Sequence, residues 1–319
     1  MTGALSRAAD GQATLQGGPG VLRPLDALVM GYIAVSCLAL SIGIARGAGR
    51  DCEVQALLSL GIGTGMLLIG WATRHTTNRW LLFARLSFAP IFYLSLYHQV
   101  EVIAPIFHSA SLDGRLAGAD HILFGGQPSL HFQEIFPSRV LTEVFCFVYF
   151  AYFLCIPLVM IAAYQRGYAA AERVVFATSL CFYVCYTFFW LFPTVAPHYW
   201  FPPHTGPQLY DGYLFSRILY VFTSHAEIRG GAFPSSHIAV ATLLTVYAYR
   251  ETPRIFPILL SITLLLYPAV VYLHAHYFVD VPSGIAVGLL VASCSDGLQD
   301  RLGRFLQPER WAHAPHTRA

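Results

Sequence analysis

Two short polar stretches lie at the ends of long apolar runs and carry the residues that could do chemistry. Residues 233–237 read Phe-Pro-Ser-Ser-His, and residues 272–280 read Tyr-Leu-His-Ala-His-Tyr-Phe-Val-Asp. Ionisable side chains at membrane depth are costly and usually mark function. His276 and Asp280 are four residues apart, so on a helix they would share one face. The carboxylate would accept a hydrogen bond from one ring nitrogen of His276 and leave the other nitrogen free to attack.

Residues 233–237 also predict the start of a helix. Ser235 and Ser236 precede an apolar run from Ile238 onward, and a Ser at a helix start caps it. The free N–H groups of a helix N-terminus bind anions, so this turn would cradle a phosphate group and direct His237 toward it. The alternative is a simple cap with a structural histidine. The histidine and aspartate of residues 276–280, at the same membrane face, weigh against that alternative.

The composition indicates a polytopic membrane protein. The chain has 319 residues, of which 56% are hydrophobic and 11% charged, and its mean hydropathy is +0.55. Soluble domains carry about 25% charged residues. The net charge of +2 gives no reason to expect a nucleic-acid partner. The chain contains no Lys, so any cationic clamp must be Arg, whose planar group suits phosphate.

The apolar runs predict the fold, because a membrane span needs ~20 mostly apolar residues. We expect an all-α, polytopic membrane helical bundle with about eight transmembrane helices. They are residues 26–46, 54–72, 80–104, 140–163, 173–193, 235–250, 255–273 and 281–298. We expect residues 1–22 to be a disordered N-terminal segment and residues 299–319 a polar C-terminal tail. Residues 23–298 would form a single transmembrane catalytic domain, with its core at about 80–298.

The arginines predict the orientation of the bundle. With eight spans both termini lie on one side, and the segments on that side carry most of the Arg residues. The positive-inside rule then puts both termini in the cytoplasm and the two polar stretches on the outer face, periplasmic or luminal. Two long outer segments, 105–139 and 194–234, contain aromatic residues that would form an interfacial belt or wall a headgroup pocket.

The order Pro-Ser-x-His and then His-x-x-x-Asp resembles the second and third signature motifs of the type-2 phosphatidic acid phosphatase superfamily. Residues 231–237 (Gly-Ala-Phe-Pro-Ser-Ser-His) and 272–280 are similar to the branch that contains inositol phosphorylceramide synthases. The resemblance is specific over about residues 190–290, with a weaker likeness at 120–125 (Asp-His-Ile-Leu-Phe-Gly) and Pro128. It implies a core of six helices, to which this chain adds two at its N-terminal end.

Phosphoryl transfer needs an in-line nucleophile, donors for the equatorial oxygens and an acid for the leaving group. We expect His276 to be the nucleophile and to form a phosphohistidine, with Asp280 orienting its ring. We expect His237 to be the general acid, because an imidazole with a pKa of about 6.5 exchanges protons near neutrality. The resemblance implies the same three roles and catalysis without metal. We expect no metal ligands and no cofactor.

The chain departs from the phosphatase branch at the phosphate clamp. That branch has a first motif, Lys-x6-Arg-Pro, and a Ser-Arg pair just before the nucleophilic histidine. Here residues 192–200 read Phe-Pro-Thr-Val-Ala-Pro-His-Tyr-Trp, and the pair is Ala269-Val270. These departures favour a transferase over a phosphatase and leave the clamp to other residues. The substrate-binding candidates are Ser235, Ser236, Arg229, Arg217 and His198.

One further arginine lies inside a predicted span. A charge in the bilayer is costly, so Arg85 would line the cavity or pair with an acid such as Glu101 or Glu143. The sequence leaves both alternatives open.

The leading functional hypothesis is an integral membrane lipid phosphotransferase. It would move a phosphorylated headgroup from a phospholipid donor to the hydroxyl group of a lipid or polyol acceptor, through phosphohistidine. The first alternative is a lipid phosphate phosphatase that acts on phosphatidic acid or an isoprenoid phosphate, with water as the acceptor. The second is a non-catalytic lipid carrier. The expected partners are the two lipids and the membrane, and the oligomeric state is left open.

Overall fold

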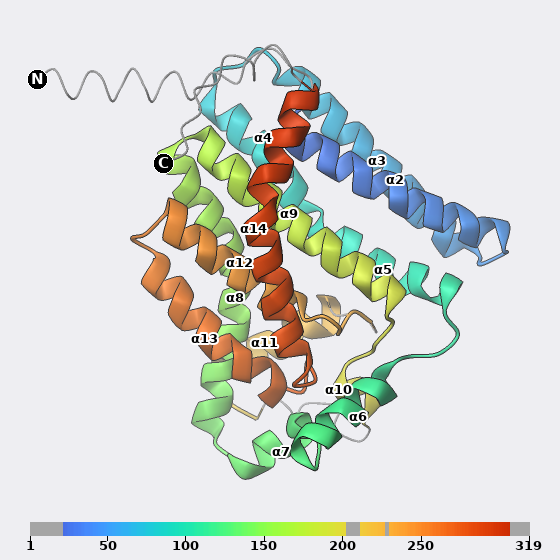
Figure 1. The fold of residues 1–319 in the computed structure, drawn as a ribbon, viewed down its shortest axis with the longest axis vertical. Coiled ribbons are helices and arrows are strands. Elements are labelled where there is room, and N and C mark those ends of the chain that lie inside the picture. Colours follow the sequence, from blue (N-terminus) through green and yellow to red (C-terminus); the bar gives the residue numbers. More distant parts are fainter. Residues whose placement is uncertain (1–21, 202–210, 227–229, 307–319) are drawn as a thin grey trace, which may run out of the picture.

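The computed structural model of the protein describes residues 22–201, 211–226 and 230–306. These residues form an all-α bundle, and no strand occurs among them (Figure 1). The helices are α2 (Pro24–Ala45), α3 (Arg50–Ala72), α4 (Arg79–Ile91), α5 (Tyr93–Phe107), α6 (Asp113–Phe124), α7 (Pro128–Ile135), α8 (Arg139–Arg166), α9 (Tyr168–Leu191), α10 (Pro197–Trp200), α11 (Leu214–Ala226), α12 (Ser236–Glu251), α13 (Phe256–Tyr272) and α14 (Asp280–Leu306). The predicted polytopic helical bundle is therefore confirmed.

Local signals in the sequence set where several long helices begin. The Asn78 side chain accepts a hydrogen bond from the N–H of Trp80 at 2.9 Å and caps α4. The Ser138 hydroxyl accepts one from Leu141 at 3.3 Å and caps α8. Gly167, at φ 142°, separates α8 from α9, in a region of backbone space that favours glycine.

Seven of the eight predicted spans fall on one helix each, and the third, 80–104, covers both α4 and α5, which separate at Phe92. Six segments of the described chain are long and apolar enough to cross a membrane, with α4 and α5 counted together as Arg79–Phe107. The helices α12 and α13 have only 16 and 17 residues. At 1.5 Å per residue they are about 24–26 Å long, short of a hydrocarbon core of about 30 Å. The count of eight therefore stays a prediction.

The ends of the bundle differ from the sequence-based expectation. The segments 105–139 and 194–234 contain four helices that hydropathy did not predict: α6, α7, α10 and α11. They are short or carry polar residues, so no long apolar run marks them. The last helix continues to Leu306, eight residues beyond the predicted span. Hydropathy ends a span where the residues become polar, whereas a helix ends only where its backbone hydrogen bonds end.

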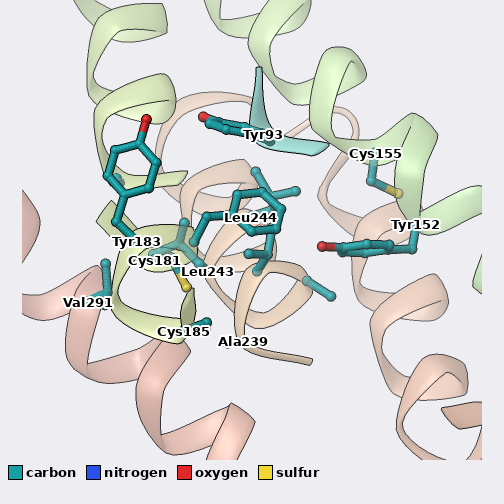
Figure 2. Packing of buried hydrophobic residues seen from close by; sticks show 14 of the residues in the cluster. Tyr93, Tyr152, Cys155, Cys181, Tyr183, Cys185, Ala239, Leu243, Leu244 and Val291 are labelled. Carbon is teal, nitrogen blue, oxygen red and sulfur yellow. The ribbon is translucent and has the colours of Figure 1, made fainter. Parts of the chain in front are cut away.

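Helix α9 lies at the centre of the bundle and is the most deeply buried of the six long segments (Figure 1). Figure 2 shows Cys181 and Cys185 of α9 among Leu243 and Leu244 of α12 and Val291 of α14. All seven cysteines are free thiols. Cys181 and Cys185 therefore act as small core side chains, as expected for buried cysteine.

Glycines allow α12 and α14 to approach closely. A Cβ atom at Gly284 would lie 2.7 Å from the carbonyl oxygen of Ser235 and 2.8 Å from Cβ of Ile238. One at Gly288, a turn further on, would collide with the carbonyl oxygen of Ala239. Small residues four apart let helix backbones meet in membrane proteins. This contact brings the start of α12 beside the start of α14.

Substitution Gly284→Val is expected to destabilise the protein by about 1–3 kcal/mol or more, because the added atoms meet backbone that cannot move cheaply. The matched control is Gly297→Val on the same helix, where no atom lies within 4 Å of a Cβ. Thermal unfolding of the detergent-solubilised protein measures both. Equal unfolding temperatures for the two variants would contradict the close packing.

The arginine inside the third predicted span holds the N-terminal helices to the bundle. Arg85 forms a buried ion pair with Asp26 of α2 and donates to Thr73 Oγ1 at 3.2 Å. Glu143 instead accepts hydrogen bonds from the first N–H groups of α11, including that of Phe215 at 2.6 Å. Arg85 therefore forms its ion pair with neither Glu101 nor Glu143. Its partner, Asp26, lies 59 residues earlier in the chain.

Candidate active site

His276 and Asp280 form a hydrogen-bonded pair at the start of α14. The distance from His276 Nδ1 to Asp280 Oδ2 is 3.1 Å, and both side chains are buried. The N–H of Tyr277 donates to the same oxygen at 2.9 Å. A carboxylate only accepts, so Nδ1 carries the proton and Nε2 keeps its lone pair.

The pairing does not arise from a shared helix face. His276 lies in the turn that precedes α14, and Asp280 is the first residue of that helix. The turn folds the imidazole back over the helix start, where a carboxylate also meets the positive end of the helix dipole. The spacing of four residues predicted the contact, but the helical explanation for it was wrong.

His237 approaches this pair from α12. Ser235 caps α12 through a bond from the N–H of Ile238 at 3.3 Å, and Ser236 and His237 are the first two helical residues. His237 Nδ1 lies 3.4 Å from His276 Nε2. Rings on α8 enclose the imidazole, with centroids 4.7 Å away for Tyr149 and 4.9 Å for Tyr152. The three candidate catalytic residues therefore meet in one place.

A cavity of about 460 Å³ opens from the two histidines into the bundle. Ser236, His237 and His276 line one part of it, and apolar and aromatic side chains of α4, α5, α8, α9 and α11 line most of the rest. One stripe of α8 lines the cavity over twelve residues, from Tyr149 to Met160, a rise of about 16 Å. The stripe comprises Tyr149, Tyr152, Phe153, Ile156, Pro157 and Met160.

The predicted phosphate clamp has no counterpart among the described residues that line this cavity, none of which is Arg. Arg217 is exposed on α11. His198 lies on α10, where its N–H and its Nδ1 are 3.2 and 3.1 Å from the carbonyl oxygen of His274. Arg229 lies outside the described residues. Of the five substrate-binding candidates, only Ser236 lines the cavity in the part of the chain that is described.

The family comparison covers the part of the chain that holds His237, His276 and Asp280. A family model of the PAP2 superfamily matches residues 115–294, more than half of the chain. The protein is a member of the PAP2 superfamily. No curated protein and no solved structure gave a match. Membership in the PAP2 superfamily makes the protein a lipid enzyme of the phosphatase or phosphotransferase type, and the apolar helices make it an integral membrane protein.

Asp120, inside the PAP2 match, lies beside the site and was not among the predicted site residues. Asp120 of α6 is buried and accepts hydrogen bonds from the N–H groups of Phe278 at 2.8 Å and Val279 at 3.1 Å. Burial raises the pKa of Asp120, and the two donors oppose that shift. A second buried aspartate of α6, Asp113, accepts from the Tyr277 hydroxyl at 2.8 Å. The weak likeness at residues 120–125 was the only sequence signal for this helix.

Proposed function

We propose that this PAP2 superfamily member is a lipid phosphotransferase, allied to the branch that contains inositol phosphorylceramide synthases. It would take a phosphorylated headgroup from a phospholipid onto His276 and pass it to the hydroxyl group of a lipid or polyol. The observation that carries the proposal is that Nε2 of the buried His276 faces His237 at 3.4 Å, where both side chains line a mostly apolar cavity. The arginine distribution favours the outer face of the membrane for this reaction.

The first half-reaction forms an N–P bond at His276. The Nε2 lone pair attacks phosphorus, the bond to the diacylglycerol oxygen breaks, and that oxygen keeps the electron pair and takes a proton from His237. Asp280 stabilises the positive charge that develops on the ring. Attack brings phosphorus within about 3–3.5 Å of Nε2, so the donor must displace His237 from its 3.4 Å contact.

The second half-reaction reverses these roles. His237 takes the proton of the acceptor hydroxyl, whose oxygen attacks phosphorus while the N–P bond breaks and its electron pair returns to Nε2. Water in place of the acceptor would give hydrolysis. The mostly apolar lining of the cavity favours transfer, because it offers water few hydrogen-bond partners and the phosphohistidine can then persist until an organic hydroxyl enters.

The length of the cavity supports a lipid substrate. The stripe of α8 that lines it rises about 16 Å, about half of a hydrocarbon core of about 30 Å. One lipid chain in one leaflet spans the same depth. A substrate held with its phosphate at the two histidines would therefore keep its chain in the cavity, in the orientation that it has in the bilayer.

The charge of the site supports a diester donor. The chain has no Lys, and no described residue that lines the cavity is Arg. A phosphate monoester carries nearly two negative charges, whereas a diester headgroup carries about one. A site with few fixed cations binds the diester at lower electrostatic cost. Arg229, Arg217 and His198 stay the proposed candidates for the remaining clamp.

With a phospholipid donor and a lipid hydroxyl acceptor, the purified protein is expected to give diacylglycerol and a new phosphodiester lipid in equal amounts. With phosphatidic acid or an isoprenoid diphosphate it should release little inorganic phosphate, and a chelator should leave the turnover unchanged. Lipid mass spectrometry and a phosphate assay measure both. Inorganic phosphate released from phosphatidic acid at a comparable rate without an acceptor would identify a lipid phosphate phosphatase instead.

A further inference from the structure

Two aspartates of α6 reach the candidate active site from outside the long helices. Figure 1 shows α6 at the end of the bundle where α14 begins. Asp113 and Asp120 are seven residues apart, so they lie about 20° from each other around the helix axis. Neither side chain is accessible to solvent. A charged group buried in this way is stable only where donors surround it.

Asp120 holds the backbone between His276 and Asp280. Its Oδ2 accepts from the N–H of Phe278 at 2.8 Å and its Oδ1 from that of Val279 at 3.1 Å. These groups precede α14 and have no partner within the helix, as at any helix N-terminus. The three N–H groups that separate the catalytic pair therefore bind carboxylates, because the N–H of Tyr277 donates to Asp280 itself.

Asp113 holds a second segment against the same turn. It accepts from the N–H groups of Val195 at 2.7 Å and Ala196 at 3.2 Å, and from the Tyr277 hydroxyl at 2.8 Å. Tyr277 directly follows His276 and is fully buried. The segment 194–196 is thereby fixed relative to the nucleophile.

The segment 194–196 also reaches the turn that carries His237. The hydroxyl oxygen of Thr194 accepts from the N–H of Phe233 at 3.0 Å, four residues before His237. Val195 and Ala196 line the cavity beside both histidines. One short helix is thus connected by hydrogen bonds to the turns of both catalytic candidates.

We propose that Asp113 and Asp120 are positioning residues that set the distance and direction between His276, His237 and the phosphorus of the substrate. They do so through the backbone of residues 277–279 and of segment 194–196, without touching the reacting atoms. The assignment rests on the proposed function only in that His276 is the nucleophile, and it holds for transfer and for hydrolysis alike. A displacement of about 1 Å in a catalytic group costs about 10²-fold in rate.

Substitution Asp120→Asn tests this assignment, since the amide keeps the shape but can accept only one of the two N–H bonds. We expect kcat for donor consumption to fall about 10–100-fold, with KM within about threefold and an unfolding temperature close to that of the wild type. The control is His121→Ala, the next residue of α6, whose side chain is exposed. A wild-type kcat in Asp120→Asn would overturn the proposal.

A second variant covers the case in which Asp120→Asn does not fold. Tyr277→Phe removes one hydroxyl donor to Asp113 and keeps the ring, so kcat should fall about 3–10-fold, as for the loss of one hydrogen bond. A wild-type kcat in a folded Tyr277→Phe protein would overturn the role of Asp113.

A double-mutant cycle separates positioning from general destabilisation. If Asp120 acts through the turn that Asp280 also holds, Asp120→Asn should cost much less in an Asp280→Asn background than alone. Fully additive losses would overturn the proposal. Consumption of the donor is measured whatever the acceptor. If the donor is hydrolysed to inorganic phosphate without an acceptor, the proposed transferase function fails, and the kcat of Asp120→Asn for donor consumption still tests the positioning role. If His276→Ala keeps wild-type consumption of the donor, both proposals fail.

Discussion

His276→Ala is expected to abolish turnover and the covalent intermediate. Removing the nucleophile of a hydrolase that works through an acyl-enzyme lowers kcat on the order of 10⁶-fold, and a phosphohistidine enzyme should lose as much. No neighbour can replace the nucleophile, because the ring nitrogen beside it belongs to His237, which the proposed mechanism uses for proton transfer.

The covalent phosphohistidine can be measured directly and tests the role of His276 more sharply than turnover does. A donor labelled in its phosphoryl group, supplied without acceptor, should leave an acid-labile and base-stable label on the wild-type protein. The label should be absent from His276→Ala and present in His121→Ala, a histidine control on the surface of α6. A labelled His276→Ala protein, or one that turns over, would remove His276 from the role of nucleophile.

Local sequence signals and the family resemblance predicted that the three candidate residues come together, because each candidate is close to a helix start that the sequence marks. Ser235 before an apolar run predicts the cap of α12 and so places His237. The four-residue spacing of His276 and Asp280 predicts their contact through a helix face, and the contact exists through a turn. Both geometries bring residues four apart together, so the sequence could not choose between them.

The supports of the cluster lie far away in the chain and could not be predicted. Asp113 and Tyr277 are 164 residues apart, and Asp120 and Phe278 are 158 apart. An aspartate in a short polar helix has the same local sequence signature whether it faces water or a buried backbone. The partner of Arg85 could not be predicted either, because Asp26 also lies far away in the chain, at the start of the first long helix.

Asp280→Asn is expected to lower kcat about 10³–10⁴-fold with little change in fold. Asp280 Oδ2 accepts hydrogen bonds from both His276 Nδ1 and the N–H of Tyr277. If the amide oxygen takes that position, both bonds survive and only the negative charge is lost. A unit charge about 4 Å from the imidazolium is worth about 4 kcal/mol at an effective dielectric constant of about 20, which is about 10³-fold in rate.

The other orientation of the amide gives a larger loss by a different route. With its NH₂ group toward His276, the imidazole must accept at Nδ1 and carry its proton on Nε2, so the attacking lone pair disappears. The corresponding change in a serine protease lowers kcat about 10⁴-fold. Single-turnover kinetics of donor consumption measure the loss, with Asp51→Asn on the exposed surface of α3 as the control. A loss below tenfold would mean that Asp280 neither orients His276 nor stabilises its charge.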